Sequence, residues 1–294
     1  MATSTPENAE LVERARLSIQ NSGLVQREVA RHIGLDETKL SKSLAGTRRF
    51  RPSELTDLAD VTGVTVNWLM SGSDQTRGVS VPPPAMVLPT RHVENSDQAQ
   101  KRRAIIESAW WLLARRGYSS VRIADIAAVC GVSTASVHYY FSTKREIFAE
   151  VLRYSVKLAF DRQIAELHAI AEPVSRLKRL IELQLPAGDR GRAEFSIWLQ
   201  TWSYVAVDES GKENHAQGYR RWIQTVEDAI AFGQQEGVFV EVPASDLAIE
   251  LTGLVDGLGI KVLTGMLTSD QMYRHIENFI DRTIVKPKGA TNEP

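Results

Sequence analysis

Cysteine is almost absent from this sequence: Cys130 is the single example in 294 residues, which excludes an intramolecular disulfide framework. The six histidines are scattered, without the close Cys/His pairs of a zinc site, and we expect neither a metal nor a cofactor. No apolar run approaches the roughly 20 residues that span a bilayer, and the N-terminus lacks a basic and then apolar signal pattern. The chain is therefore predicted to be cytoplasmic and soluble, with no membrane partner.

Catalytic motifs are missing as well. The sequence has no Gly-x-Ser-x-Gly elbow, no Gly-x-x-x-x-Gly-Lys phosphate loop, no His-Glu-x-x-His pair and no dinucleotide fingerprint after a strand. An enzyme that is merely targeted by its N-terminal part therefore has little support. We predict that the chain is not an enzyme.

The formal net charge is only −1, but positive charge is concentrated in two basic islands. Residues 27–51 and residues 101–150 each carry an excess of four basic side chains, whereas residues 151–294 carry an excess of four acidic ones. Basic surface is what phosphate contact requires, so the islands favour nucleic acid as a partner. Random fluctuation would explain either island taken alone.

Apolar residues recur with helical period, and alternating strand-like runs are nearly absent, which predicts an all-α fold. Thr5 and Pro6 are typical of a helix start, and that first helix should end at Gly23. Short helices are expected over 26–33, 37–45, 53–61 and 65–70. A Pro-rich linker follows at 73–97, and longer helices follow it.

A small residue, a glycine and an aliphatic residue occur twice at the same separations: Ala30, Gly34 and Leu40, then Ala127, Gly131 and Val137. In a helix-turn-helix, a small residue is needed where the helices cross, the turn needs a residue that tolerates positive φ, and the second helix buries an aliphatic side chain. Any helical hairpin could show this spacing once. Its second occurrence, also in a basic island, favours two DNA-binding modules.

In the first copy, Asp36 is placed to cap the second helix and turn that helix's polar residues outward. The predicted DNA-binding residues of this copy are Gln26, Glu37, Thr38, Lys39, Ser41, Lys42, Arg48, Arg49 and Arg51. A solvated loop is the alternative for the arginines. The stretch VQREVARHIGLDETKLSKSLAG, with the later VTVNWLMSG, resembles the Xre or lambda-repressor-like family over about 9–72, with Trp68 as its core aromatic. Such a module binds either DNA or protein.

In the second copy, Ser133 is placed to cap a helix of barely two turns that ends in consecutive aromatics. Short side chains on this helix would face bases, while hydroxyls and cations would contact phosphates. The predicted DNA-binding residues are Arg122, Thr134, Ala135, Ser136, His138, Tyr139, Tyr140 and Lys144. Core packing is the alternative for the two tyrosines, and a merely exposed side chain is the alternative for Arg122.

The stretch AIIESAWWLLARRGYSSVRIADIAAVCGVSTASVHYYFSTKREIFAEVL resembles the DNA-binding segment of TetR-family regulators. It departs from the family where Val121 and Arg122 replace two hydroxyl residues, so the usual hydroxyl cap is missing there. Residues 147–286 have the length and helical pattern of that family's ligand-binding and dimerisation domain. Within them, LAIELTGLVDGLGIKVLTG is most similar to the choline-responsive regulators of betaine synthesis, a similarity that does not fix the ligand.

Two features of this C-terminal part suggest binding surfaces. Gly253, Gly257 and Gly259 lie on one apolar helix and would allow close helix contact in a twofold dimer, with an intrachain core as the alternative. The residues predicted to line a ligand pocket are Phe195, Trp198, Trp202 and Trp222, with Gln200 or Asp256 as a polar anchor. Simple core packing is the alternative for each tryptophan.

The predicted domains are a helix-turn-helix domain at 5–72, a linker at 73–97, a TetR-like helix-turn-helix domain at 98–146 and a ligand-binding and dimerisation domain at 147–286. Together they predict a sequence-specific transcriptional regulator, a ligand-responsive repressor that binds a palindromic operator as a homodimer. The additional module would extend DNA contact, and the effector would be an unknown small apolar molecule. The alternative is a ligand-independent architectural DNA-binding protein.

Overall fold

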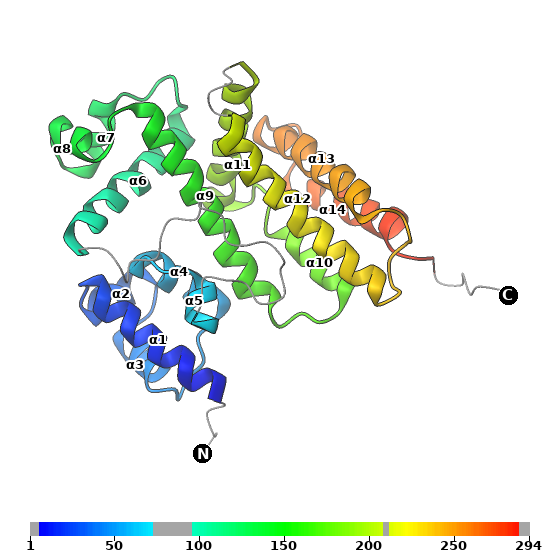
Figure 1. Cartoon of the computed structure of the whole chain (residues 1–294), viewed down its shortest axis with the longest axis horizontal. Helices are drawn as coiled ribbons and strands as arrows, with labels where there is room; N and C mark the ends of the chain where they lie inside the picture. Colours follow the sequence, from blue (N-terminus) through cyan, green and yellow to red (C-terminus); the bar gives the residue numbers. More distant parts are fainter. Residues whose placement is uncertain (1–5, 73–95, 208–211, 288–294) are drawn as a thin grey trace. The chain divides into compact units, whose positions relative to one another are not determined.

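The computed structural model of the chain describes residues 6–72, 96–207 and 212–287 (Figure 1). Within these ranges the chain is helical, apart from one isolated antiparallel bridge between Phe239 and Val285, which confirms the predicted all-α class. The predicted linker falls almost wholly outside the described residues, and so does the expected N-cap Thr5. None of the described helices is long and apolar enough to cross a membrane.

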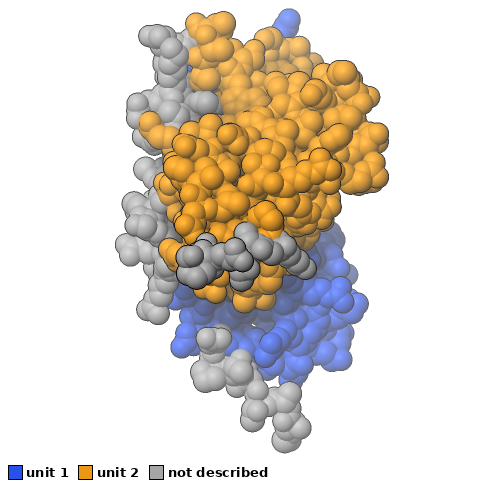
Figure 2. All heavy atoms as spheres, turned by 90° about the vertical axis from the view of Figure 1, so that its right-hand side faces the viewer, with its two compact units in different colours: residues 1–110, 121–166 blue, residues 111–120, 167–294 orange. Residues whose placement is uncertain are grey.

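Contacts divide the chain into two compact units, which Figure 2 draws in different colours. Unit 1 comprises residues 1–110 and 121–166, and unit 2 comprises residues 111–120 and 167–294. Both helix-turn-helix copies therefore belong to unit 1. The helices α6 (Ser96–Arg116) and α9 (Lys144–Leu167) each contribute residues to both units.

The N-terminal part of unit 1 is a bundle of short helices, namely α1 (Pro6–Ser22), α2 (Gln26–His32), α3 (Glu37–Leu44), α4 (Pro52–Thr62) and α5 (Val66–Ser71). Their starts agree with the predicted ones to within a residue. The bundle encloses a core in which Leu40, Leu58 and Leu69 are fully buried, and Trp68 belongs to the same core. This apolar core fixes the direction in which α3 presents its polar face.

The second helix-turn-helix of unit 1 consists of α7 (Ile123–Cys130) and α8 (Thr134–Tyr140). The Cys130 thiol of α7 donates to the Ala104 carbonyl of α6, and the Arg102 guanidinium of α6 lies over the Phe141 ring, which follows α8. Val137 and Phe141 are buried, so the aliphatic residue of α8 and the last aromatic of the Tyr-Tyr-Phe run are core residues. The buried Trp110 of α6 donates its indole N–H to the Ser155 hydroxyl of α9 at 2.5 Å.

Unit 2 is built from α10 (Pro173–Glu182), α11 (Gly188–Val207), α12 (Lys212–Gln235), α13 (Ala244–Leu263), α14 (Ser269–Phe279) and a π-helical turn (Ile280–Ile284). Helix α13 packs against α11, α12 and α14. One face of α13 is buried in the unit's core through Leu247, Leu251, Val255 and Val262.

Candidate nucleic-acid interface and effector site

The repeated spacing produces the same turn in both copies. Gly34 and Gly131 have φ values of +67° and +68°, a left-handed conformation that side chains with a Cβ rarely adopt. In each copy the N–H after the glycine donates to the carbonyl of the small residue in the preceding helix, at 2.9 Å in the first and 3.0 Å in the second. The small and aliphatic residues of both copies are buried: Ala30, Leu40, Ala127 and Val137. Two helix pairs are therefore locked in the geometry that the sequence predicts.

The outer face of α3 is open to solvent. Asp36 caps the helix by accepting the Lys39 backbone N–H at 2.7 Å, so the helix begins where the sequence predicts. Eight predicted DNA-binding residues of this copy are exposed: Gln26, Glu37, Thr38, Lys39, Ser41, Lys42, Arg49 and Arg51. A groove or a partner can reach these side chains without any unpacking of the domain.

Arg48 is the exception in this copy, because its guanidinium is committed within the domain. Its two terminal nitrogens lie 2.7 Å and 2.5 Å from the carboxylate oxygens of Glu54, and one of them also donates to the Ser43 hydroxyl at 2.9 Å. Glu54 is buried and also accepts the Arg51 backbone N–H at the start of α4. Arg48 thus joins the end of α3 to α4 and is placed for structure rather than for phosphate contact.

Helix α8 carries six of the eight residues of the second predicted set. Ser133 caps the helix by accepting the Ser136 backbone N–H at 3.1 Å. Four predicted residues are exposed, namely Thr134, Ala135, His138 and Tyr139, whereas Ser136 and Tyr140 are half-buried. The two tyrosine rings meet edge to face, with centroids 4.9 Å apart. Tyr139, 70% exposed, is therefore a surface residue that Tyr140 supports.

The start of α7 is capped without a hydroxyl residue. The Asp125 carboxylate accepts the Arg122 backbone N–H at 2.7 Å, and Val121 is fully buried, so the missing hydroxyls are replaced by a carboxylate and a core residue. The Arg122 side chain is exposed. Lys144 is half-buried and its ammonium donates to the Val121 carbonyl at 3.0 Å, which ties α9 to the loop before α7.

Three half-buried aromatic rings form a triangle in unit 2. The ring centroids of Trp198 and Trp202 are 6.4 Å apart, and Tyr219 of α12 lies 6.4 Å and 6.3 Å from them. The faces of aromatic rings attract organic cations that lie within about 6 Å of the ring centroid, so the triangle supplies the type of side chain that recognises such a ligand.

A carboxylate from α13 completes this cluster. The Tyr219 hydroxyl donates a hydrogen bond to the Asp256 carboxylate. Burial raises the pKa of the Asp256 carboxyl to about 6, although the Tyr219 hydrogen bond opposes the shift. Burial and the adjacent carboxylate raise the pKa of Tyr219, so its hydroxyl stays protonated at neutral pH. We call Trp198, Trp202, Tyr219 and Asp256 the aromatic-carboxylate cluster.

Two of the four predicted pocket residues lie in this cluster, and two serve other purposes. Phe195 is buried and packs edge to face on Trp202, so it supports the cluster from behind. Trp222 packs on the core of unit 2. Gln200, one of the two expected polar anchors, donates to the Leu113 carbonyl and accepts the Tyr118 N–H, which leaves Asp256 as the anchor.

Tyr219 is the cluster residue that the sequence pattern did not predict. It lies three residues before Trp222 and therefore shares a face of α12 with it, which was the available signal. Periodicity alone does not decide which of two neighbouring aromatics on a helix reaches the site. That choice depends on how α12 packs against α11 and α13.

The three glycines of α13 have two different environments. Gly259 is buried, and a Cβ placed there would lie 2.0 Å from the Phe195 ring, so this glycine serves packing between α13 and α11 within the chain. Gly253 and Gly257 are exposed, with nothing within 4 Å of an added Cβ. Ile249, 58% exposed, extends the same outward face by one turn.

Comparison with protein-family models matches three segments of the chain. Residues 105–151 match the bacterial regulatory proteins of the tetR family, and residues 173–285 match the C-terminal domain of BetI-type transcriptional repressors. Residues 10–68 match a helix-turn-helix domain model. Each match coincides with a part whose helices are described above.

Known proteins and solved structures agree with these matches. A crystal structure of a protein from Saccharomonospora viridis, described as a transcriptional regulator in complex with choline, is 48% identical, with a TM-score of 0.62, and covers 65% of this chain and 100% of its own. The transcriptional regulator BetI of Rhizobium meliloti is 24% identical over 164 residues, which are 55% of this chain and 77% of that protein. The regulator PksA of Bacillus subtilis is 21% identical over 67% of this chain and 96% of its own length.

Proposed function

The chain belongs to the TetR family of DNA-binding transcriptional regulators, with a BetI-type C-terminal domain and an additional N-terminal helix-turn-helix domain, and we propose that it is a dimeric repressor released from its operator by a quaternary ammonium compound of the choline type. The family is not enzymatic. The observation that carries the proposal is the aromatic-carboxylate cluster of unit 2.

The chemistry of this cluster matches a quaternary ammonium group. Methyl groups around a positive nitrogen bury well against aromatic rings, and the ring quadrupole attracts the charge. The half-buried carboxylate of Asp256 supplies a negative charge in a partly desolvated setting, where it attracts a cation more strongly than in water. A cation with an apolar surface therefore replaces the purely apolar effector that the sequence suggested. The relative that contains choline is 48% identical to this chain and supports the same assignment.

The outward face of α13 supports twofold association. Gly253 and Gly257 leave room for a second helix to approach closely, and the exposed Ile249 supplies apolar surface beside them. In an isologous dimer the same patch would meet itself, and the two α8 helices would then read a palindromic operator. An effector that binds one arrangement of the dimer more tightly than the other shifts the population between them and so alters DNA affinity.

Direct titration of the full chain tests the effector. Choline should quench or shift the intrinsic tryptophan fluorescence in a saturable way. Dimethylbutanol, the uncharged carbon isostere of choline, should bind at least about tenfold more weakly, since tenfold corresponds to roughly 1.4 kcal/mol of lost cation attraction.

Asp256→Asn should also weaken choline binding by about tenfold or more, because it removes the charge at nearly constant shape. The matched control is Asp246→Asn, an exposed carboxylate in the first turn of the same helix, which should bind choline like the unmodified chain. Equal affinity for choline and its uncharged isostere, or equal affinity in the two variants, would exclude a cation site here.

A further inference from the structure

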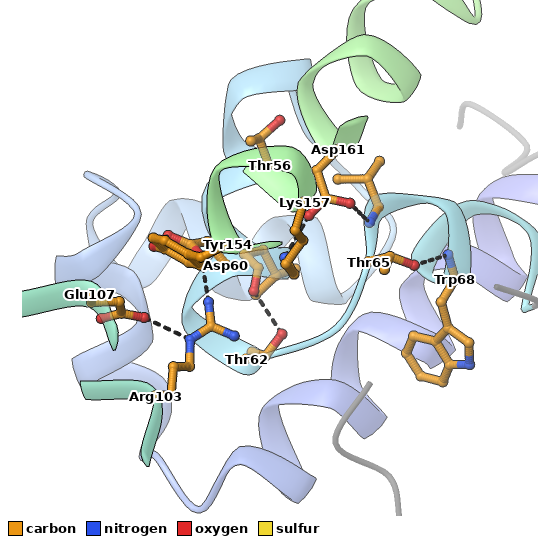
Figure 3. A network of polar contacts seen from close by, with 12 residues as sticks. Thr56, Asp60, Thr62, Thr65, Trp68, Arg103, Glu107, Tyr154, Lys157 and Asp161 are labelled. Atoms are coloured by element: carbon orange, nitrogen blue, oxygen red, sulfur yellow. Dashed lines mark hydrogen bonds and ion pairs between the residues drawn. The ribbon is translucent and has the colours of Figure 1, made fainter. Parts of the chain in front are cut away.

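The N-terminal helix bundle contacts α6 and α9 through charged side chains that are largely withdrawn from solvent (Figure 3). Asp60, in the last turn of α4, accepts a charged hydrogen bond from the Arg103 guanidinium of α6. It also accepts the Tyr154 hydroxyl of α9, at 3.1 Å and 3.2 Å from its two oxygens. Arg103 is only 9% exposed and is balanced on its other side by Glu107 at 2.6 Å.

A second buried contact lies further along α9. The Lys157 ammonium and the Asp161 carboxylate, one turn apart, form an ion pair at 2.5 Å, and both side chains are 1% exposed. The other oxygen of Asp161 accepts the backbone N–H of Val66, the first residue of α5, at 2.8 Å. One carboxylate thus satisfies a charge on its own helix and a backbone donor of the N-terminal bundle.

Apolar contact accompanies these polar ones. Ala165 of α9 is fully buried within the hydrophobic core of the N-terminal bundle, and Ile164 packs against the same core. At the opposite end, Gln100 of α6 donates to the carbonyl of Ser22, where α1 ends. We call these residues the docking surface: Gln100, Arg103, Tyr154, Lys157, Asp161, Ile164 and Ala165.

Burial of an ion pair is favourable only where every charge finds partners, because desolvation removes the water that would otherwise stabilise it. On the docking surface, the partners of Arg103 and Asp161 include groups of the N-terminal bundle. The docking surface therefore fits the N-terminal bundle as its occupant. If the bundle only moved on a flexible connection, Arg103 and Asp161 would lose these partners.

We propose that the N-terminal bundle is a permanently docked part of the DNA-binding unit, held by α6 and α9, so that the spacing between α3 and α8 on DNA is set by the docking surface and not by the segment 73–95. The docking does not depend on the function proposed above. The consequence for spacing on DNA does, because it requires that α3 contacts DNA.

Cleavage of the connecting segment tests the docking. A protease site inserted between residues 73 and 95 of the full chain is cut after folding, and the products are separated by size exclusion. The N-terminal fragment should co-elute with the remainder at micromolar concentration, because the docking surface holds it without the covalent link. Separate elution of the two fragments would overturn the proposal.

Two variants assign the retention to the docking surface. Asp60→Asn keeps an acceptor for Tyr154 but removes the charge that faces Arg103, and Glu107 remains to balance that arginine, so the chain should fold. It should raise the dissociation constant of the cleaved fragment at least tenfold. Glu13→Gln, a charge removal at a 76% exposed side chain of the same bundle, should leave it unchanged. Equal retention in both variants would overturn the role of the Asp60–Arg103 pair.

Lengthening the segment 73–95 by ten Gly/Ser residues tests the spacing. With a docked bundle, the preferred distance between the DNA segments contacted by α3 and α8 should stay the same, whereas a tethered bundle would accept a wider range of distances. An unchanged preferred distance between the two DNA segments supports docking, whereas tolerance of a wider range of distances overturns it. If α3 protects no DNA at all, the proposed DNA contact of the N-terminal bundle fails, and the cleavage assay still decides the docking.

Discussion

The ring of Phe195 fills the space in which a side chain on Gly259 would begin, with the ring 2.0 Å from the position of an added Cβ. This contact sets how closely α13 approaches α11. Helix α13 carries Asp256, and α11 carries the two tryptophans of the aromatic-carboxylate cluster. A glycine that the sequence favours for a dimer thus serves the interior of one chain.

Gly259→Ala should therefore destabilise unit 2 and weaken choline binding. An extra methyl in a filled core typically costs about 1–3 kcal/mol, which outweighs the roughly 1 kcal/mol that alanine gains over glycine within a helix. Urea unfolding followed by circular dichroism measures the change. Phe195→Leu in the same chain should restore part of the loss, because it removes part of the ring that the added methyl meets. A Gly259→Ala chain as stable as the unmodified chain would contradict this packing.

Association should depend on the outward face of α13. Ile249→Asp places a charge on that face, and in an isologous dimer the charge is buried twice, so the dimer dissociation constant should rise at least about 100-fold. Sedimentation velocity across a concentration series measures it. Val207→Asp, at an 86% exposed position at the end of α11, is the matched control and should associate normally. A dimer that tolerates Ile249→Asp would have its interface elsewhere.

Adjacent arginines should behave differently on DNA. Arg49→Ala removes an exposed cation, so it should lower the affinity for any DNA duplex. The slope of log affinity against log salt concentration should fall in magnitude by about 1. The free energy of unfolding should change by less than about 0.5 kcal/mol. Arg48→Ala breaks the pair with the buried Glu54 and should cost about 2 kcal/mol of folding free energy. Salt-dependent fluorescence anisotropy and thermal unfolding separate the two effects. The reverse pattern would show that Arg48, not Arg49, contacts phosphate.

Choline affinity should depend on pH through Asp256. Its pKa in the folded chain is raised to about 6, so the carboxylate that attracts a cation is present above that pH and is lost as the pH falls through it. Affinity should fall about tenfold between pH 7 and pH 5, and choline binding at pH 5 should release a proton. Isothermal titration calorimetry measures both. In Asp256→Asn the affinity should be flat over this range, and a parallel decline there would assign the pH dependence to another group.

Features set by neighbouring residues were predictable from the sequence, and features set by helix packing were not. The turns at Gly34 and Gly131 and the caps at Asp36 and Ser133 depend on residues a few positions apart, so a spacing pattern reveals them. The repeated motif thus predicted both helix-turn-helix pairs and most of their exposed residues.

The effector site was only half predictable. Trp198 and Trp202 were found by their density on one helix, but the selection of Tyr219 over Trp222 depends on the rotation of α12 against α11. The docking surface gave no local signal either, because Asp60 and Arg103 are 43 positions apart. The Arg48–Glu54 pair was within reach, since a glutamate three residues after a helix start typically turns back to the preceding segment.

The central claim is that a small organic cation in unit 2 controls DNA binding by unit 1. The most direct test first selects bound duplexes from random DNA with the full chain. It then measures affinity for the selected duplex while choline chloride replaces sodium chloride at constant total salt. We predict at least a tenfold loss of affinity that saturates with choline and is absent from the Asp256→Asn chain. An affinity that stays constant across the whole replacement would contradict the account and would favour an architectural DNA-binding protein that responds to no such ligand.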